Sequence, residues 1–196
     1  SLNSGGATSI APEAGFNKCS DSCGAANLQS VSPNSFACAN LGPNAVTLTV
    51  NDGNGNTNTC TATVTVQDNT LPTISCPNPV TVTCAGQIPA VNLAAVMASD
   101  NCGAPAKTHL SDATSNQTCT NRKTVTRTYR ATDASGNSVT CAQVITVFDN
   151  VAPNFSSVPA HVSVQCHQIP AVGNPTATDG CGGPVTITYD GQTVSL

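Results

Sequence analysis

Residues 38–69, CANLGPNAVTLTVNDGNGNTNTCTATVTVQDN, decide the fold, because residues 119–150, CTNRKTVTRTYRATDASGNSVTCAQVITVFDN, repeat their pattern. Every matched position has the same offset, from the first cysteine (119 − 38 = 81) to the last asparagine (150 − 69 = 81). A fixed period indicates a tandem array of one structural unit. The period predicts three repeats: 1–71, which lacks its first strand; 72–152, which is complete; and 153–196, the N-terminal part of a third. Both ends interrupt a repeat, so we expect a window on a longer repetitive protein.

Two alternating stretches inside the repeat predict a β-hairpin with one buried face. In residues 45–51 (AVTLTVN) apolar side chains alternate with Thr, and the same alternation returns in residues 60–66 (CTATVTV). Between them, residues 52–56 (DGNGN) are rich in residue types that tolerate positive φ and form turns. Alternation with period two around such a turn is typical of antiparallel strands. Since no stretch sustains a helical period, the sequence predicts an all-β fold.

The composition indicates a disulfide-stapled extracellular protein. The 196 residues include 11 Cys, no Trp and only 3% aromatic residues, so the core of each small unit must be aliphatic. Disulfides offset a limited core in small extracellular domains. The chain has no C-x-x-C pair and only three scattered His, which argues against a structural zinc site.

Charge and hydropathy exclude two classes of partner. Charged residues make up 8% of the chain and its formal net charge is −4, whereas a nucleic-acid-binding surface needs clustered Lys and Arg. No apolar run reaches the ~18–20 residues of a membrane-spanning helix. We therefore expect no nucleic-acid partner and no membrane span in this segment.

Several motifs together carry a family resemblance. They are residues 42–60 (GPNAVTLTVNDGNGNTNTC), residues 124–141 (TVTRTYRATDASGNSVTC), Cys76-Pro77, residues 100–103 (DNCG) and residues 147–149 (VFD). In this combination they resemble the hyalin repeat (HYR) domain. The resemblance implies tandem immunoglobulin-like, fibronectin-III-related β-sandwich repeats on extracellular proteins associated with adhesion. The cysteine content and Asn/Thr-rich style are also similar to long surface proteins of Bacteroidetes-type bacteria.

The separations between cysteines favour two recurring bridges. Cys38 and Cys60 have the same separation as Cys119 and Cys141 (60 − 38 = 22; 141 − 119 = 22), and both pairs flank the hairpin. A second recurring pair would fasten the first strand to the D-x-C-G corner. Spacing favours these pairs but does not determine connectivity. The expected bridges are Cys38–Cys60, Cys84–Cys102, Cys119–Cys141 and Cys166–Cys181, which leave Cys19, Cys23 and Cys76 unassigned.

Acidic residues recur with the repeat, and two interpretations of them remain open. Seven of the ten stand at equivalent positions: Asp21, Asp100 and Asp179; Asp52 and Asp133; Asp68 and Asp149. The favoured interpretation is that these side chains cap their own turns. The other is a calcium site between repeats, since Ca²⁺ is bound by carboxylate, amide and backbone oxygens. Its candidate ligands are Asp68, Asn69, Asp100, Asp133, Asp149 and Asn150.

Arg127 is a departure from the repeat. It occupies the position of Val46, which faces inward in the first hairpin (127 − 46 = 81). A buried charge is costly unless it is paired. We therefore expect the second repeat to open its sandwich at Arg127.

The sequence offers little evidence for a catalytic site. Cys166 and His167 are adjacent, but neighbours on a strand point to opposite faces. His109 and His161 have no recurring acidic partner. We therefore expect no enzyme activity.

The favoured function is a non-enzymatic extracellular structural or adhesive repeat protein, part of a cell-surface fibre or long adhesin. Its partners would be neighbouring copies of itself and cell-surface or glycan ligands. The alternative is an accessory binding module, for glycan or protein, of a larger secreted protein. A glycan site usually uses exposed aromatic rings, and the chain offers only Tyr129, Tyr189 and four Phe.

Overall fold

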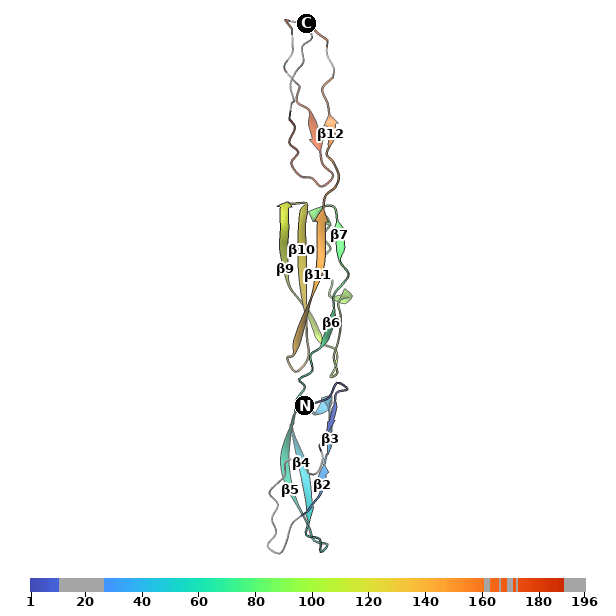
Figure 1. Ribbon diagram of the computed structural model, residues 1–196, viewed down its shortest axis with the longest axis vertical. Helices are drawn as coiled ribbons and strands as arrows, with labels where there is room; N and C mark the ends of the chain where they lie inside the picture. Colours follow the sequence, from blue (N-terminus) through green and yellow to red (C-terminus); the bar gives the residue numbers. More distant parts are fainter. Residues whose placement is uncertain (11–26, 161–162, 166, 169–170, 172, 189–196) are drawn as a thin grey trace. The chain divides into compact units, whose positions relative to one another are not determined.

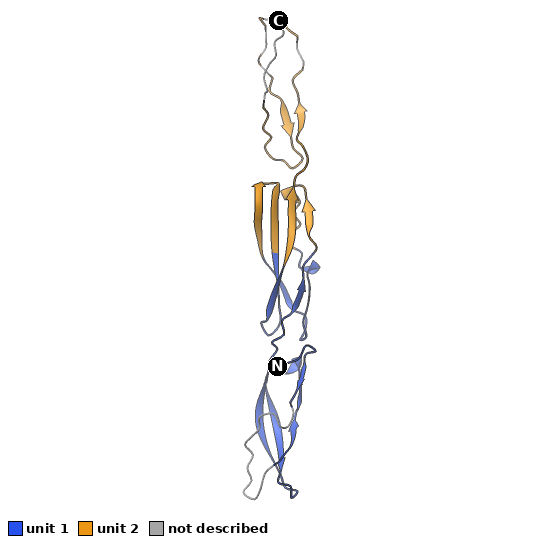
Figure 2. Ribbon diagram, viewed as in Figure 1, with its two compact units in different colours: residues 1–77, 92–110, 128–141 blue, residues 78–91, 111–127, 142–196 orange. Residues whose placement is uncertain are grey.

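The computed structural model describes residues 1–10, 27–160, 163–165, 167–168, 171 and 173–188. These residues form strands and three short 3-10 helices, with no α-helix among them, so the predicted all-β class is confirmed (Figure 1). They divide into two compact units (Figure 2). Unit 1 comprises residues 1–77, 92–110 and 128–141, and unit 2 comprises residues 78–91, 111–127 and 142–196. The boundaries of the three predicted repeats stay a prediction.

The predicted hairpin is the central element of unit 1. It consists of β4 (Gly42–Asn51) and β5 (Thr57–Val66), which pair antiparallel with Leu48 opposite Cys60. The backbone N–H of Asp52 donates to the carbonyl of Asn56 at 3.2 Å and closes the turn. On its other side β4 pairs with β2 (Asn27–Ser32), which makes a three-stranded sheet.

The alternation of apolar residues and Thr produces the core of unit 1. Val46 and Leu48 on β4 and Val66 on β5 are 1%, 4% and 4% exposed, while the Thr residues between them face outward. Leu2, Val31 and Phe36 complete the buried cluster. Phe36 lies on β3 (Ser35–Ala37), which pairs with β1 (Ala7–Ser9).

Short elements complete unit 1. β6 (Thr73–Ser75) pairs antiparallel with β8 (Met97–Ser99). Two 3-10 helices also belong to it, η1 (Cys38–Asn40) and η3 (Leu93–Ala95). No helix in the described part of the chain is long and apolar enough to cross a membrane.

The larger sheet has the order β7-β11-β10-β9. Its strands are β7 (Val80–Val82), β9 (Ala106–Cys119), β10 (Arg122–Thr132) and β11 (Ser138–Phe148). β7 runs parallel to β11, while β9, β10 and β11 contribute residues to both units. Unit 2 also contains η2 (Ala85–Gln87) and the antiparallel pair β12 (Asn154–Ser157) and β13 (Thr176–Thr178).

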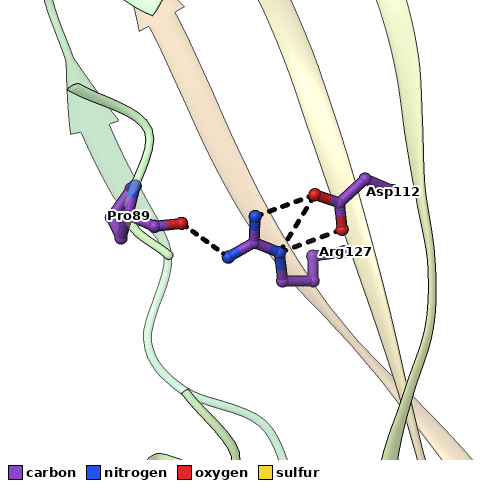
Figure 3. A network of polar contacts seen from close by, with 3 residues as sticks. All are labelled: Pro89, Asp112 and Arg127. Atoms are coloured by element: carbon purple, nitrogen blue, oxygen red, sulfur yellow. Dashed lines mark hydrogen bonds and ion pairs between the residues drawn. The ribbon is translucent and has the colours of Figure 1, made fainter. Parts of the chain in front are cut away.

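Arg127 on β10 is buried and paired (Figure 3). Its Nε donates to both carboxylate oxygens of Asp112 on β9, at 2.9 and 3.2 Å, and its Nη2 donates to Asp112 Oδ2 at 2.8 Å. Its Nη1 donates to the Pro89 carbonyl at 2.8 Å. Only 4% of Arg127 is exposed. The expectation that the sandwich opens here is therefore wrong, because Asp112 and Pro89 satisfy the guanidinium inside the fold.

Candidate functional site

The structure pairs the cysteines differently from the prediction. Three disulfides form among the described residues: Cys38–Cys102, Cys76–Cys141 and Cys84–Cys181. Their Cα–Cα distances of 5.2, 5.7 and 5.1 Å lie in the usual range for disulfides. Cys60 and Cys119 are free and exposed. The expected pairs Cys38/Cys60, Cys84/Cys102, Cys119/Cys141 and Cys166/Cys181 are therefore wrong, and Cys19, Cys23 and Cys166 themselves lie outside the described residues.

The register of the hairpin explains why Cys38 does not meet Cys60. Leu48 stands opposite Cys60 on β5, well along β4 from its start at Gly42 (48 − 42 = 6). Six strand residues span about 20 Å, and Cys38 precedes Gly42. A disulfide requires Cα atoms within about 7 Å. Flanking a hairpin at equal spacing therefore did not imply contact.

The observed bridges follow another rule, which the separations concealed. Cys102 and Cys181 are both the third residue of a D-x-C-G corner, and each bonds to a cysteine of the preceding repeat as the period defines it. Cys76, for which the spacing predicts no partner, bonds to Cys141 within the second repeat. The position one period before Cys76 falls before Ser1, so the printed sequence holds no such partner for Cys60.

The recurring acids cap turns, as the favoured interpretation predicted, and the two hairpin tips show it with matching geometry. Asp52 Oδ1 accepts from the N–H groups of Asn54 and Asn56 at 2.8 and 3.1 Å, and Oδ2 accepts from Asn56 Nδ2 at 2.6 Å. Asp133 Oδ1 accepts from the N–H groups of Ser135 and Asn137 at 2.9 and 2.8 Å, and Oδ2 from Asn137 Nδ2 at 2.8 Å. The amide of Asn56, with the Asn54 N–H, lowers the pKa of Asp52.

The other described acids of the set cap turns as well. Asp100 accepts from the Cys102 N–H at 2.9 Å, and Asp179 accepts from the Cys181 N–H at 2.8 Å. Asp149 accepts from the Val151 N–H at 3.0 Å. Asp21 lies outside the described residues.

Asp68 is held by several partners of unit 1. Its Oδ1 accepts from the Thr70 N–H at 3.1 Å and from Asn101 Nδ2 at 3.3 Å. Its backbone carbonyl accepts from Asn137 Nδ2 at 2.9 Å. Only 4% of Asp68 is exposed. These contacts place a buried carboxylate beside the hairpin tip of Asp133 and the corner of Asp100.

In addition to capping turns, three of these acids converge in unit 1. One carboxylate oxygen each of Asp68, Asp100 and Asp133 lies within 4.8 Å of the others. At an effective dielectric constant of ~20, two unit charges at this distance repel by about 3 kcal/mol. No cationic side chain in the described part of the chain pairs with any of the three. The group is therefore electrostatically unfavourable on its own.

Three buried oxygens of this group and of the adjoining Asn101 accept no hydrogen bond: Asp68 Oδ2, Asp100 Oδ1 and Asn101 Oδ1. Buried polar atoms without a partner are rare in folded proteins. All three are acceptors, so the group has an excess of negative and partially negative oxygens. A positively charged partner would satisfy them.

The candidate calcium ligands are thus brought together only in part. Asp149 gathers instead with Asp179 and Cys181 in unit 2. The positions of Asn69 and Asn150 as ligands stay a prediction. Sequence reasoning missed Asn101 and Asn137, although each adjoins or closes a turn of the recurring acids. Only the second repeat has Asn inside its D-x-C-G corner, where the others have Ser22 and Gly180.

Comparison with known families agrees with this architecture. Residues 72–147 match the family model described as an HYR-like domain with 4 cysteines. Comparison with curated protein sequences gave no match. Such a domain is a non-catalytic repeat, and together with several disulfides it is typical of secreted or extracellular proteins. The matched range of this chain holds five cysteines: Cys76, Cys84, Cys102, Cys119 and Cys141. Residues 72–147 are therefore similar to the HYR-like domain family, which confirms the predicted resemblance to the hyalin repeat.

Proposed function

We propose that the chain is a non-enzymatic structural or adhesive segment of a cell-surface fibre or long adhesin. HYR-like domains are typical of extracellular adhesive repeat proteins. The observation that carries the proposal is the position of two disulfides. Cys38–Cys102 joins residues on either side of the predicted repeat boundary at 71/72, and both cysteines lie in unit 1. Cys84–Cys181 joins residues on either side of the boundary at 152/153, and both lie in unit 2.

A disulfide that crosses a repeat boundary ties two repeats together, whereas a disulfide inside one repeat does not. Cys76–Cys141 restricts the second repeat alone. The Cys38–Cys102 bridge closes a loop of 64 residues, which on chain entropy contributes about 4 kcal/mol against unfolding. It also ties the first repeat to the second, so the two cannot separate while the bridge is intact. A disulfide that links neighbouring repeats suits a protein that must bear tension.

Electron microscopy and X-ray scattering of the oxidised 196-residue chain test the proposal. We expect end-to-end association into threads with periodic density as the concentration rises. Compact single particles without periodic spacing would refute the fibre role.

A matched pair of variants tests the bridge itself. Cys38→Ser removes a cysteine that crosses the boundary, whereas Cys60→Ser removes a free, exposed cysteine of the same predicted repeat. We expect the radius of gyration to rise only in Cys38→Ser, because only that change releases the first repeat from the second. A specific hit on a glycan array, with no self-association, would instead favour the accessory binding module.

A further inference from the structure

We propose that Asp68, Asp100, Asp133 and Asn101 form a Ca²⁺-binding site in unit 1. One oxygen from each of the three carboxylates lies within 4.8 Å of the others. Oxygens on a shell of radius ~2.4 Å, the usual Ca²⁺–O distance, are at most about 4.8 Å apart. The three oxygens are therefore close enough together to bind one calcium ion.

The unsatisfied oxygens point to a cation independently of the convergence of the acids. Asp68 is only 4% exposed, and its Oδ2 has no hydrogen-bond donor. Asp100 Oδ1 and Asn101 Oδ1 are likewise buried without a donor. Since the turn-capping bonds are already complete, these atoms remain available to a cation.

The donor chemistry selects a hard divalent cation. All the donors are carboxylate or amide oxygens, which Ca²⁺ prefers, and thiolate and imidazole are absent from the group. One oxygen from each of three carboxylates converges, and second carboxylate oxygens or water would complete the six to eight ligands that Ca²⁺ takes. Mg²⁺ requires a near-ideal octahedron at a shorter distance, which such a crowded set of carboxylates fits less well.

The site is also held in place before any ion binds. Cys102, which bonds to Cys38, stands next to Asn101 and shares its corner with Asp100. Asn101 Nδ2 donates to Asp68 Oδ1 at 3.3 Å, and Asn137 Nδ2 joins Asp133 Oδ2 to the Asp68 carbonyl, at 2.8 and 2.9 Å. Little ordering is therefore left to accompany binding.

The other acidic group provides a contrast. Asp149 and Asp179 gather with Cys181, whose sulfur is already bonded to Cys84. With two carboxylates in place of three, we expect this group to make no comparable site. The calcium site does not depend on the proposed structural function, and each can fail without the other.

The chain contains a matched control for the test. Asp52 and Asp133 cap the same kind of turn with the same pattern of hydrogen bonds, but only Asp133 belongs to the acidic group. Asn at either position keeps an Oδ1 acceptor for the turn. Asp133→Asn therefore removes a charge from the site, while Asp52→Asn makes the same local change elsewhere.

The experiment measures Ca²⁺ binding to the oxidised, metal-stripped chain by isothermal titration calorimetry, with thermal unfolding as a second readout. We expect one site with a Kd of roughly 10⁻⁴–10⁻³ M, as in extracellular calcium modules. Asp133→Asn should weaken binding by about tenfold or more and abolish the rise in Tm with Ca²⁺, whereas Asp52→Asn should leave both unchanged. Asp100→Asn, on a different corner, should repeat the loss if Asp133→Asn lowers the yield of folded protein.

Three results would overturn the assignment. The first is no binding by the wild-type chain at about 10 mM Ca²⁺, well above the expected Kd. The second is an equal loss of affinity in Asp52→Asn and Asp133→Asn, which would attribute the effect to the turn. The third is Mg²⁺ binding as tight as that of Ca²⁺, because the crowded carboxylates are expected to favour Ca²⁺ over Mg²⁺.

Discussion

The ion pair between the buried Arg127 and the partly exposed Asp112 supports a prediction that comparison with the preceding repeat makes specific. The positions one period earlier are Val46 and Val31 (127 − 81 = 46; 112 − 81 = 31), and both are buried in the apolar core of unit 1. One repeat therefore has two valines where the next has a salt bridge. The double variant Arg127→Val/Asp112→Val gives the second repeat the two valines that the first repeat has at these positions.

The single variants should be costly, and by different amounts. Losing one partner of a buried pair costs ~3–5 kcal/mol, since the other charge is left without compensation. Asp112→Val leaves the guanidinium of Arg127 without its carboxylate partner. The Arg127 side chain is only 5% exposed, so we expect the full cost. Arg127→Val leaves the Asp112 carboxylate without its partner, but that side chain is 34% exposed and reaches water. We therefore expect a loss of about 2–3 kcal/mol in the free energy of unfolding.

The double variant should restore most of the loss. Replacing a whole buried ion pair by apolar residues is often neutral or stabilising. The Pro89 carbonyl loses its bond from Nη1 at 2.8 Å, which costs ~1 kcal/mol or more. We therefore expect the free energy of unfolding of the double variant to lie within about 1–2 kcal/mol of the wild-type value.

The assay is urea unfolding of the four oxidised chains followed by far-ultraviolet circular dichroism, evaluated as a double-mutant cycle. Hydrogen exchange of peptides from β9 and β10 shows whether the loss is local to the pair. If the double variant loses as much as the two single variants added together, Arg127 and Asp112 are not coupled and the reasoning fails. An equal cost for the two single variants would refute the argument from exposure.

Two further predictions concern the disulfides and their surroundings. In Cys84→Ser we expect Cys119 to bond to Cys181, because Cys119 is the counterpart of Cys38 and the nearby Asn121 side chain accepts from the Ala85 N–H at 2.9 Å; peptide mapping without reduction that finds Cys181 as a free thiol would contradict this. Gly6→Ala should cost at least about 2 kcal/mol in urea unfolding, since φ is +71° and a Cβ would lie 2.7 Å from both the Asn101 carbonyl oxygen and Cys38 Sγ. Gly53→Ala, with φ of +75° and open space around it, should cost only about 1 kcal/mol, and equal costs would remove the clash from the explanation.

What the sequence predicted well was local. The hairpin follows from alternation and a turn that lie in one continuous stretch of chain, so β4 and β5 were expected nearly as they occur. The turn-capping acids follow for the same reason, since each accepts from N–H groups two to four residues away. The resemblance to the hyalin repeat rests on the same local motifs.

What the sequence did not predict depends on segments far apart in the chain. The disulfides span 64, 65 and 97 residues, and the two that cross a repeat boundary have no common separation, so equal spacing pointed to the wrong partners. Asp112 gives no sign of its role because it does not recur, and Arg127 therefore looked unpaired. The three acids of the group, Asp68, Asp100 and Asp133, were among the predicted ligands, but Asn101 and Asn137 were not, because they reach Asp68 from 33 and 69 residues away in the sequence.

The disulfides also set how far the polypeptide can be stretched. The backbone between Cys38 and Cys181 (181 − 38 = 143) would extend to roughly 490 Å if fully unravelled. Tension instead passes from Cys38 to Cys102, back along the chain to Cys84 (102 − 84 = 18), and across to Cys181. That returning segment extends to only about 60 Å. The two bridges add only 5.2 and 5.1 Å, so even with every strand pulled apart the oxidised chain between these cysteines is short, and reduction would lengthen it about sevenfold.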